Sequence, residues 1–196
     1  MVIVKNQKIK IMKKIIGVAF LFLSVCVNAQ DITVSGASFK KKLDVKGDVL
    51  TYNGAGLRQK YGFDLYVGAL YLPNQSSDAN KVINSDEIQS INIKIISNKV
   101  TRDKFNETVS EGFSKASHGK ATEEQRKLFK SFFSDEIKNK DDILLIYKPG
   151  KGVAVMINGK YKGVVGNLEF KKALWSIWLG TNPADEKLKK KMLGKV

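Results

Sequence analysis

The segment from Ile143 to Val165 constrains the fold more than any other part of the chain, because three apolar runs follow one another with only tight turns between them. Pro149-Gly150-Lys151-Gly152 separates the first run from the second, and Asn158-Gly159 separates the second from the third. Asn-Gly is the preferred pair of a two-residue type I′ hairpin turn, since both of its residues adopt positive φ there. The segment therefore predicts a three-strand antiparallel meander.

Alternating apolar and polar residues predict strands earlier in the chain as well. Residues 41–45 and 49–53 flank the turn Lys46-Gly47-Asp48, and Gly54-Ala55-Gly56 interrupts the second of these strands. Two glycines so close together suggest a bulge or the close approach of another backbone. Two further alternating runs are residues 63–71 and 91–95.

Helical periodicity and helix caps mark the remaining segments. Thr101 and Asn167 are suitable N-caps, and Thr122 with Gln125 has the spacing of a capping box. The helix after Asn167 places an apolar face toward the core but leaves Trp175 outside that face. The predicted helices are residues 78–83, 101–116, 122–133, 167–179 and 185–193.

The order of these elements defines the fold class. Strands come first, two helices follow, and the meander and two more helices complete the chain. This order does not alternate as βαβ units do. The sequence therefore predicts an α+β fold in which helices cover a mainly antiparallel sheet.

The N-terminal segment has the pattern of a cleavable signal peptide. After Met12, two lysines precede the 13-residue apolar run Ile15–Val27, and small residues follow up to Ala29. This run is shorter than the roughly 20 residues that a helix needs to span a bilayer. We expect cleavage after Ala29, which would remove residues 1–29 and leave a single domain at 30–196. Met12 is also an alternative start, so residues 1–11 could come from a mis-assigned initiation codon.

Cys26 allows a second interpretation of this segment, because Leu23-Ser24-Val25-Cys26 is close to a lipoprotein box. A small residue is usual at the position that Val25 occupies, so simple cleavage is favoured over lipid attachment. Simple cleavage predicts a periplasmic or secreted protein.

The charge balance limits the partners. The net charge of +15 falls by five to +10 when the first 29 residues, which hold five lysines and no acid, are removed. Basic patches attract nucleic acids or anionic membranes. The last ten residues carry five lysines without interleaved aromatic residues or a nucleic-acid motif, so nucleic acid is not an expected partner. A weak contact with a membrane surface and a solvated helix end both remain open.

Metal and cofactor motifs give no support for an enzyme class. The chain contains one Cys and one His, which excludes a disulfide framework and a zinc site built from several such residues. No dinucleotide, P-loop or metalloprotease spacing occurs. We therefore expect neither a metal nor a cofactor.

Two neighbouring motifs resemble a known family. Residues 53–58 read NGAGLR, and residues 61–73 read YGFDLYVGALYLP. Together they resemble the opening of the chalcone isomerase fold, specifically its bacterial chalcone isomerase-like branch. The likeness extends through the meander to Ile177-Trp178-Leu179-Gly180, so it covers nearly all of residues 32–194. It implies an open-faced β-sandwich, in which a large antiparallel sheet and a layer of helices enclose an apolar cleft.

The resemblance also implies a site. In the plant isomerases an Arg, a strand Thr, a helix Tyr, a helix Asn and a late Thr surround the flavonoid. The Arg is retained as Arg58, while the strand Thr is replaced by Tyr66. The other three positions hold Phe105, Gly112 and Ile177. An isomerase must stabilise a developing enolate oxygen, and these three side chains supply no hydrogen-bond donor for it. We expect them to line a wider and drier cleft.

Arg58 and Tyr66 would then be the two polar groups of this cleft. Fatty-acid-binding relatives of the fold use an Arg and a Tyr to hold a carboxylate, which a guanidinium can bind through two parallel hydrogen bonds. The resulting hypothesis is an exported, non-catalytic binding protein for a fatty-acid-like carboxylate. The alternatives are an isomerase or intramolecular lyase acting on an enone-like substrate, and an accessory envelope protein with a vestigial pocket.

Structural roles for these residues also remain open at this stage. Arg58 could pair with an acid such as Asp64 or Glu107, and Tyr66 could be an ordinary tyrosine at a core boundary. Phe105 could belong to the core rather than to a pocket.

Overall fold

The computed structural model describes residues 31–195, so the predicted signal peptide at residues 1–29, with Cys26, lies outside the described residues. Seven strands form one antiparallel sheet in which each strand pairs with the next one along the chain. They are β3 (Lys42–Val45), β4 (Asp48–Lys60), β5 (Phe63–Leu72), β6 (Gln89–Ile95), β7 (Asp142–Lys148), β8 (Gly152–Ile157) and β9 (Lys160–Val165). The predicted meander is confirmed, with Asn158 and Gly159 both at positive φ in its second turn.

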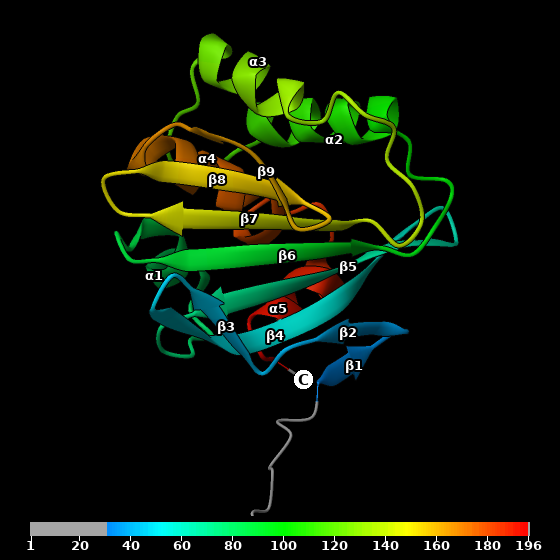
Figure 1. Cartoon of the computed structure of the whole chain (residues 1–196), viewed down its shortest axis with the longest axis horizontal. Helices are drawn as coiled ribbons and strands as arrows, with labels where there is room; N and C mark the ends of the chain where they lie inside the picture. Colours follow the sequence, from blue (N-terminus) through cyan, green and yellow to red (C-terminus); the bar gives the residue numbers. More distant parts are fainter. Residues whose placement is uncertain (1–30, 196) are drawn as a thin grey trace, which may run out of the picture.

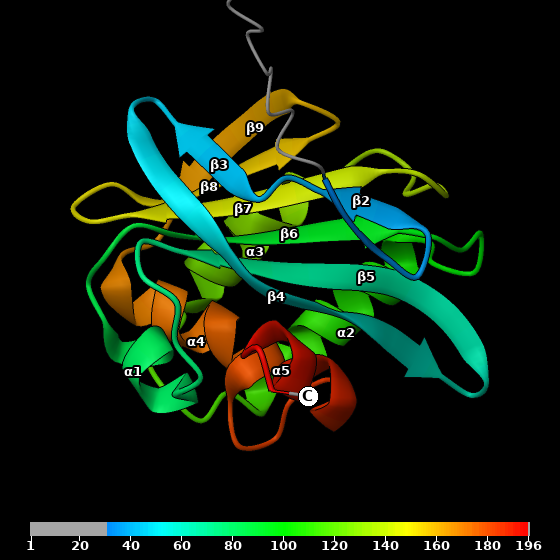
Figure 2. The ribbon, with the colours of Figure 1, turned by 90° about the horizontal axis from the view of Figure 1, so that it is seen from below.

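Five helices cover one face of this sheet (Figures 1 and 2). The predicted N-caps Thr101, Thr122 and Asn167 each accept a backbone hydrogen bond in the first turn of their helix. The helix after Thr101 ends at Ser114, earlier than expected. Within residues 31–195, no helix combines the length and the apolar character that crossing a bilayer requires. The helices are α1 (Ala79–Asn84), α2 (Arg102–Ser114), α3 (Glu123–Ser131), α4 (Leu168–Leu179) and α5 (Glu186–Met192).

The larger hydrophobic core, the helix-side core, fills the space between the sheet and the helices. α4 lies in its centre, in contact with α1, α2, α5 and β8. Trp175 is fully buried on this helix, although the sequence pattern placed it outside the apolar face. The pattern fails here because α4 is surrounded on nearly all sides, so even residues off its apolar face are enclosed.

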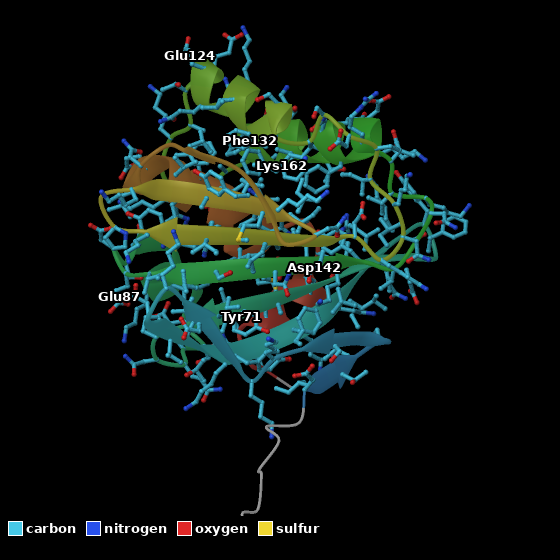
Figure 3. The ribbon with its side chains drawn as sticks, viewed as in Figure 1. Tyr71, Glu87, Glu124, Phe132, Asp142 and Lys162 are labelled. Carbon is cyan, nitrogen blue, oxygen red and sulfur yellow. The ribbon has the colours of Figure 1, made fainter. Side chains whose placement is uncertain are left out.

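The opposite face of the sheet is covered by a short hairpin that the sequence analysis did not predict, β1 (Ile32–Val34) and β2 (Ala37–Phe39). Phe39 packs with Val67 and Tyr71 in a smaller cluster, the hairpin-side core. The Tyr71 hydroxyl donates a hydrogen bond to the Lys40 carbonyl at 3.0 Å. Figure 3 shows Tyr71 and Asp142 on this side of the sheet.

The glycines of β4 form the surface on which the last helix, α5, packs; this contact is the seat of α5. β4 runs unbroken through Gly54 and Gly56, with a register shift after Tyr52, so the predicted bulge is present but does not end the strand. A Cβ on Gly54 would lie 2.1 Å from the Lys191 carbonyl oxygen, and one on Gly56 would lie 2.8 Å from the Lys191 Cβ. Only glycine lets the backbone of α5 approach β4 this closely. Figure 2 shows α5 against β4.

Candidate functional site

Arg58 on β4 and Tyr66 on β5 are direct cross-strand partners. Directly opposed residues of an antiparallel pair project from the same face of the sheet. Tyr66 belongs to the helix-side core, and the Arg58 side chain is only 14% exposed. The structure thus brings together the two polar residues that the sequence predicted for one site.

Tyr66 is a buried, neutral phenol. Burial raises its pKa, although the hydrogen bond from Trp178 and the nearby Arg58 charge act in the opposite direction. Its hydroxyl oxygen accepts a hydrogen bond from Trp178 Nε1 at 3.0 Å. Because this bond uses a lone pair of the oxygen, the phenolic proton can be donated to a further acceptor. Trp178 was not predicted as a partner of Tyr66.

Arg58 makes an ion pair that the sequence analysis did not anticipate. Its Nη1 donates to Asp185 Oδ2 at 3.2 Å and to the Gln59 carbonyl at 2.7 Å. Asp185, rather than Asp64 or Glu107, is therefore the carboxylate that pairs with Arg58. Asp64 instead accepts a hydrogen bond from the Gln59 side chain.

Asp185 also forms the N-cap of α5. Its Oδ1 accepts from the backbone N–H groups of Lys187 at 2.8 Å and of Leu188 at 3.0 Å. Burial opposes its ionisation, but hydrogen bonds from backbone N–H groups and from Arg58 outweigh burial and lower the pKa of the carboxyl. The spacing of Asp185 before a helical run could have revealed the cap, but not the partner 127 residues earlier in the chain.

A groove of about 540 Å³ opens beside Arg58. Its walls come from the end of β4, from α2 and from residues 181–184, which join α4 to α5. Gly112 and Ile177 line it together with Arg58, whereas Tyr66 does not. A smaller groove of about 370 Å³, between the β1–β2 turn and residues 139–140, contains none of the predicted site residues.

Phe105 does not line the groove beside Arg58. It is buried in the helix-side core, with its ring centroid 4.6 Å from that of Phe133. Aromatic rings at this separation are in direct contact. The structure therefore places Phe105 in the core, which is the structural role that the sequence left open.

Gly112 and Ile177 narrow the space between two helices. A Cβ on Gly112 would lie 2.8 Å from Cγ1 of Ile177, so the missing side chain lets Ile177 of α4 pack directly on the backbone of α2. The expectation that these two residues widen the cleft is wrong, because the Ile177 side chain fills the room that Gly112 leaves. The open volume lies outward of this contact, beside Arg58.

Comparisons with known proteins agree with this architecture. The family model described as chalcone isomerase-like matches residues 30–194. A crystal structure of a fatty-acid binding protein from Arabidopsis thaliana is similar with a TM-score of 0.67 and 21% sequence identity, over 84% of this chain and 96% of that one. At this identity the likeness concerns the fold. No curated protein sequence gives a significant match. The α+β fold expected from the sequence is confirmed, and the chain belongs to the chalcone isomerase-like family.

Proposed function

We propose that this protein is an exported, non-catalytic binding protein that holds an apolar carboxylate, such as a fatty acid, at Arg58 and Tyr66. The observation that carries the proposal is the direct cross-strand pairing of a guanidinium that lines an open groove with a neutral phenol buried behind it. The hydrogen bonds from Arg58 to Asp185 and to the Gln59 carbonyl both come from Nη1, and the guanidinium also interacts with the Tyr66 hydroxyl. The two oxygens of a ligand carboxylate would bind at the edge formed by Nε and Nη2.

Tyr66 would add the third hydrogen bond to the carboxylate through its own proton. The ligand's hydrocarbon tail would leave this polar end along the groove, where Ile177, Pro183 and Ala184 offer apolar contacts. A volume of 540 Å³ falls within the range of roughly 300–1,000 Å³ that is usual for small-molecule pockets. The fatty-acid binding protein of the same fold supports this ligand class.

Absence of catalysis is part of the proposal. Chalcone cyclisation requires donors that stabilise an enolate oxygen, and Phe105, Gly112 and Ile177 provide none at the positions that match the plant isomerases. Purified protein should not accelerate loss of chalcone absorbance above the spontaneous rate. Turnover that disappears in Arg58→Ala would instead support an isomerase or intramolecular lyase.

Export and a weak membrane contact complete the proposal. N-terminal sequencing of protein from the envelope fraction should give Gln30 as the first residue. The exposed side chains of Lys187, Lys190, Lys191 and Lys195 would contact anionic lipids. The protein should co-sediment with phosphatidylglycerol vesicles at low salt and not with phosphatidylcholine vesicles. A lipid attached to Cys26, or equal binding to both vesicle types, would contradict these statements.

Ligand titration tests the central claim. Dodecanoate and hexadecanoate should bind and raise the melting temperature, and Arg58→Ala should weaken binding by more than about tenfold, because charge-assisted hydrogen bonds contribute about 1.5–3 kcal/mol each. Arg58→Lys should also weaken binding, since an ammonium lacks the planar fork. Lys104→Ala is the matched control, because Lys104 is an exposed cation of α2 that does not line the groove.

Two outcomes would overturn the proposal. If the acids and their methyl esters bind equally well, the groove recognises only hydrocarbon. If Arg58→Ala lowers stability without changing affinity, Arg58 serves only its ion pair with Asp185.

A further inference from the structure

The candidate site already contains a carboxylate, and it belongs to the protein itself. Asp185 Oδ2 lies 3.2 Å from Arg58 Nη1, and the two side chains are 16% and 14% exposed. An ion pair shielded from water in this way is less weakened by solvent than a surface pair. A ligand carboxylate approaching Arg58 would therefore meet both a guanidinium that is already paired and a second negative charge.

We propose that Asp185 is a built-in competitor that determines which ligands the site accepts. This inference rests on the proposed function. A ligand carboxylate at the Nε–Nη2 edge of Arg58 displaces Asp185 Oδ2 from Nη1, because two carboxylates held on one guanidinium repel each other. A small carboxylate such as acetate has nothing to offset this displacement. A long tail does, since each buried methylene raises affinity by roughly fourfold.

The two oxygens of Asp185 make this displacement feasible, because they have separate partners. Oδ1 caps α5 through the N–H groups of Lys187 and Leu188, whereas Oδ2 contacts Arg58. The carboxylate also interacts with the backbone N–H of Gln59. It can release Arg58 while Oδ1 keeps the helix capped. The flanking residues Ala184 and Glu186 line the groove, so Asp185 is held next to the proposed ligand path.

The substitution Asp185→Asn tests this proposal. Asn is as good an N-cap as Asp, so the helix keeps its cap, while the amide nitrogen replaces the oxygen that accepts from Arg58. Dodecanoate should bind more than about fivefold tighter than to the wild type, and methyl dodecanoate should bind with unchanged affinity. Asp78→Asn is the matched control, because Asp78 caps α1 in the same way. It should change neither affinity.

The outcomes separate this inference from the proposed function. If Arg58→Ala abolishes dodecanoate binding but Asp185→Asn leaves it unchanged or weaker, Asp185 is not a competitor, while the carboxylate site stands. If Asp185→Asn strengthens the binding of acid and ester alike, the effect is a looser groove and the inference is overturned. If Arg58→Ala binds dodecanoate as well as the wild type, the proposed function itself fails.

Discussion

Lys171 and Arg58 are both buried cations on the helix-covered side of the sheet. They differ in how many of their hydrogen-bond donors are used within residues 31–195. Lys171 is fully buried, and its Nζ donates to the carbonyls of Val82 at 2.8 Å, Ile83 at 3.0 Å and Ser85 at 3.1 Å. Arg58 makes two bonds from a single nitrogen and lines an open groove.

A buried cation can bind a ligand only if it keeps hydrogen-bond donors that the protein does not use. An ammonium has three donors, and Lys171 uses all of them to hold the C-terminal carbonyls of α1. A guanidinium has five donors, and those of Arg58 are not all used within residues 31–195. Lys171 is therefore a structural clamp between α4 and α1, while Arg58 has both the remaining donors and the access that a site needs.

The largest expected effect is at the structural clamp. Lys171→Met should lower the free energy of unfolding by about 3–5 kcal/mol, because it removes the donor of the buried Ile83 and Ser85 carbonyls and one of the donors of the Val82 carbonyl, which keeps its bond from Gln89. Denaturant titration measures this loss. Dodecanoate affinity of the folded variant should stay at the wild-type level. A loss below about 1 kcal/mol would show that solvent satisfies these carbonyls and that Lys171 is not a clamp.

Gly54→Ala should displace α5 from its packing position on β4. The new Cβ would meet the Lys191 carbonyl at 2.1 Å, so α5 must move, at a cost of about 1–3 kcal/mol. Hydrogen exchange should show faster exchange in α5 and unchanged rates in α1. Gly68→Ala is the control, because its Cβ would be 3.5 Å from the nearest atom of Leu188, an ordinary contact. Equal effects of the two substitutions would contradict a tight seat at Gly54.

Arg58→Met should affect ligand binding more than stability, the reverse of Lys171→Met. It should lower the free energy of unfolding by only about 1–2 kcal/mol, because Asp185 keeps its backbone hydrogen bonds. It should nevertheless abolish carboxylate binding. Calorimetric unfolding and ligand titration on the same samples measure both quantities. If Arg58→Met destabilised the fold as much as Lys171→Met, the distinction between a clamp and a site would be lost.

The smallest expected effect, per pH unit, is a pH dependence of stability. Burial lowers the pKa of Lys171 to about 7, well below the usual lysine value of about 10.4 in an unfolded chain. Between these values the unfolded chain binds more protons, so stability should rise with pH, by at most about 1.4 kcal/mol per unit. Denaturant titrations between pH 7 and 9 should show this rise, and Lys171→Met should remove it. A flat profile in the wild type would contradict the lowered pKa.

Local signals predicted most of the fold and half of the site. Asn158-Gly159 predicted a turn, Thr122 with Gln125 predicted the start of a helix, and the glycines of β4 predicted a bulge. Each of these signals depends on only a few neighbouring residues. Arg58 and Tyr66 could be assigned to one site through the resemblance to the chalcone isomerase fold, and the structure makes them cross-strand neighbours.

Long-range packing could not be predicted in the same way. Asp185 meets Arg58 across 127 residues, and nothing in the sequence near either residue identifies its partner. Lys171 has the residue type of a solvated position, but α1 covers it. The β1–β2 hairpin was missed because strands of three residues give too little alternation to recognise.

The seat of α5 on β4 has a consequence for the order of folding. Asn53 donates a hydrogen bond to the Met192 carbonyl, 139 residues later in the chain, whereas every strand of the main sheet pairs with its neighbour in sequence. Neighbouring strands can pair as the chain grows, but α5 docks only when the last residues are present. Until then Arg58 has no carboxylate partner, and the groove lacks the wall around Ala184. A ligand present during folding would therefore meet Arg58 before Asp185 can pair with it. The groove wall around Ala184 would then form beside the bound ligand.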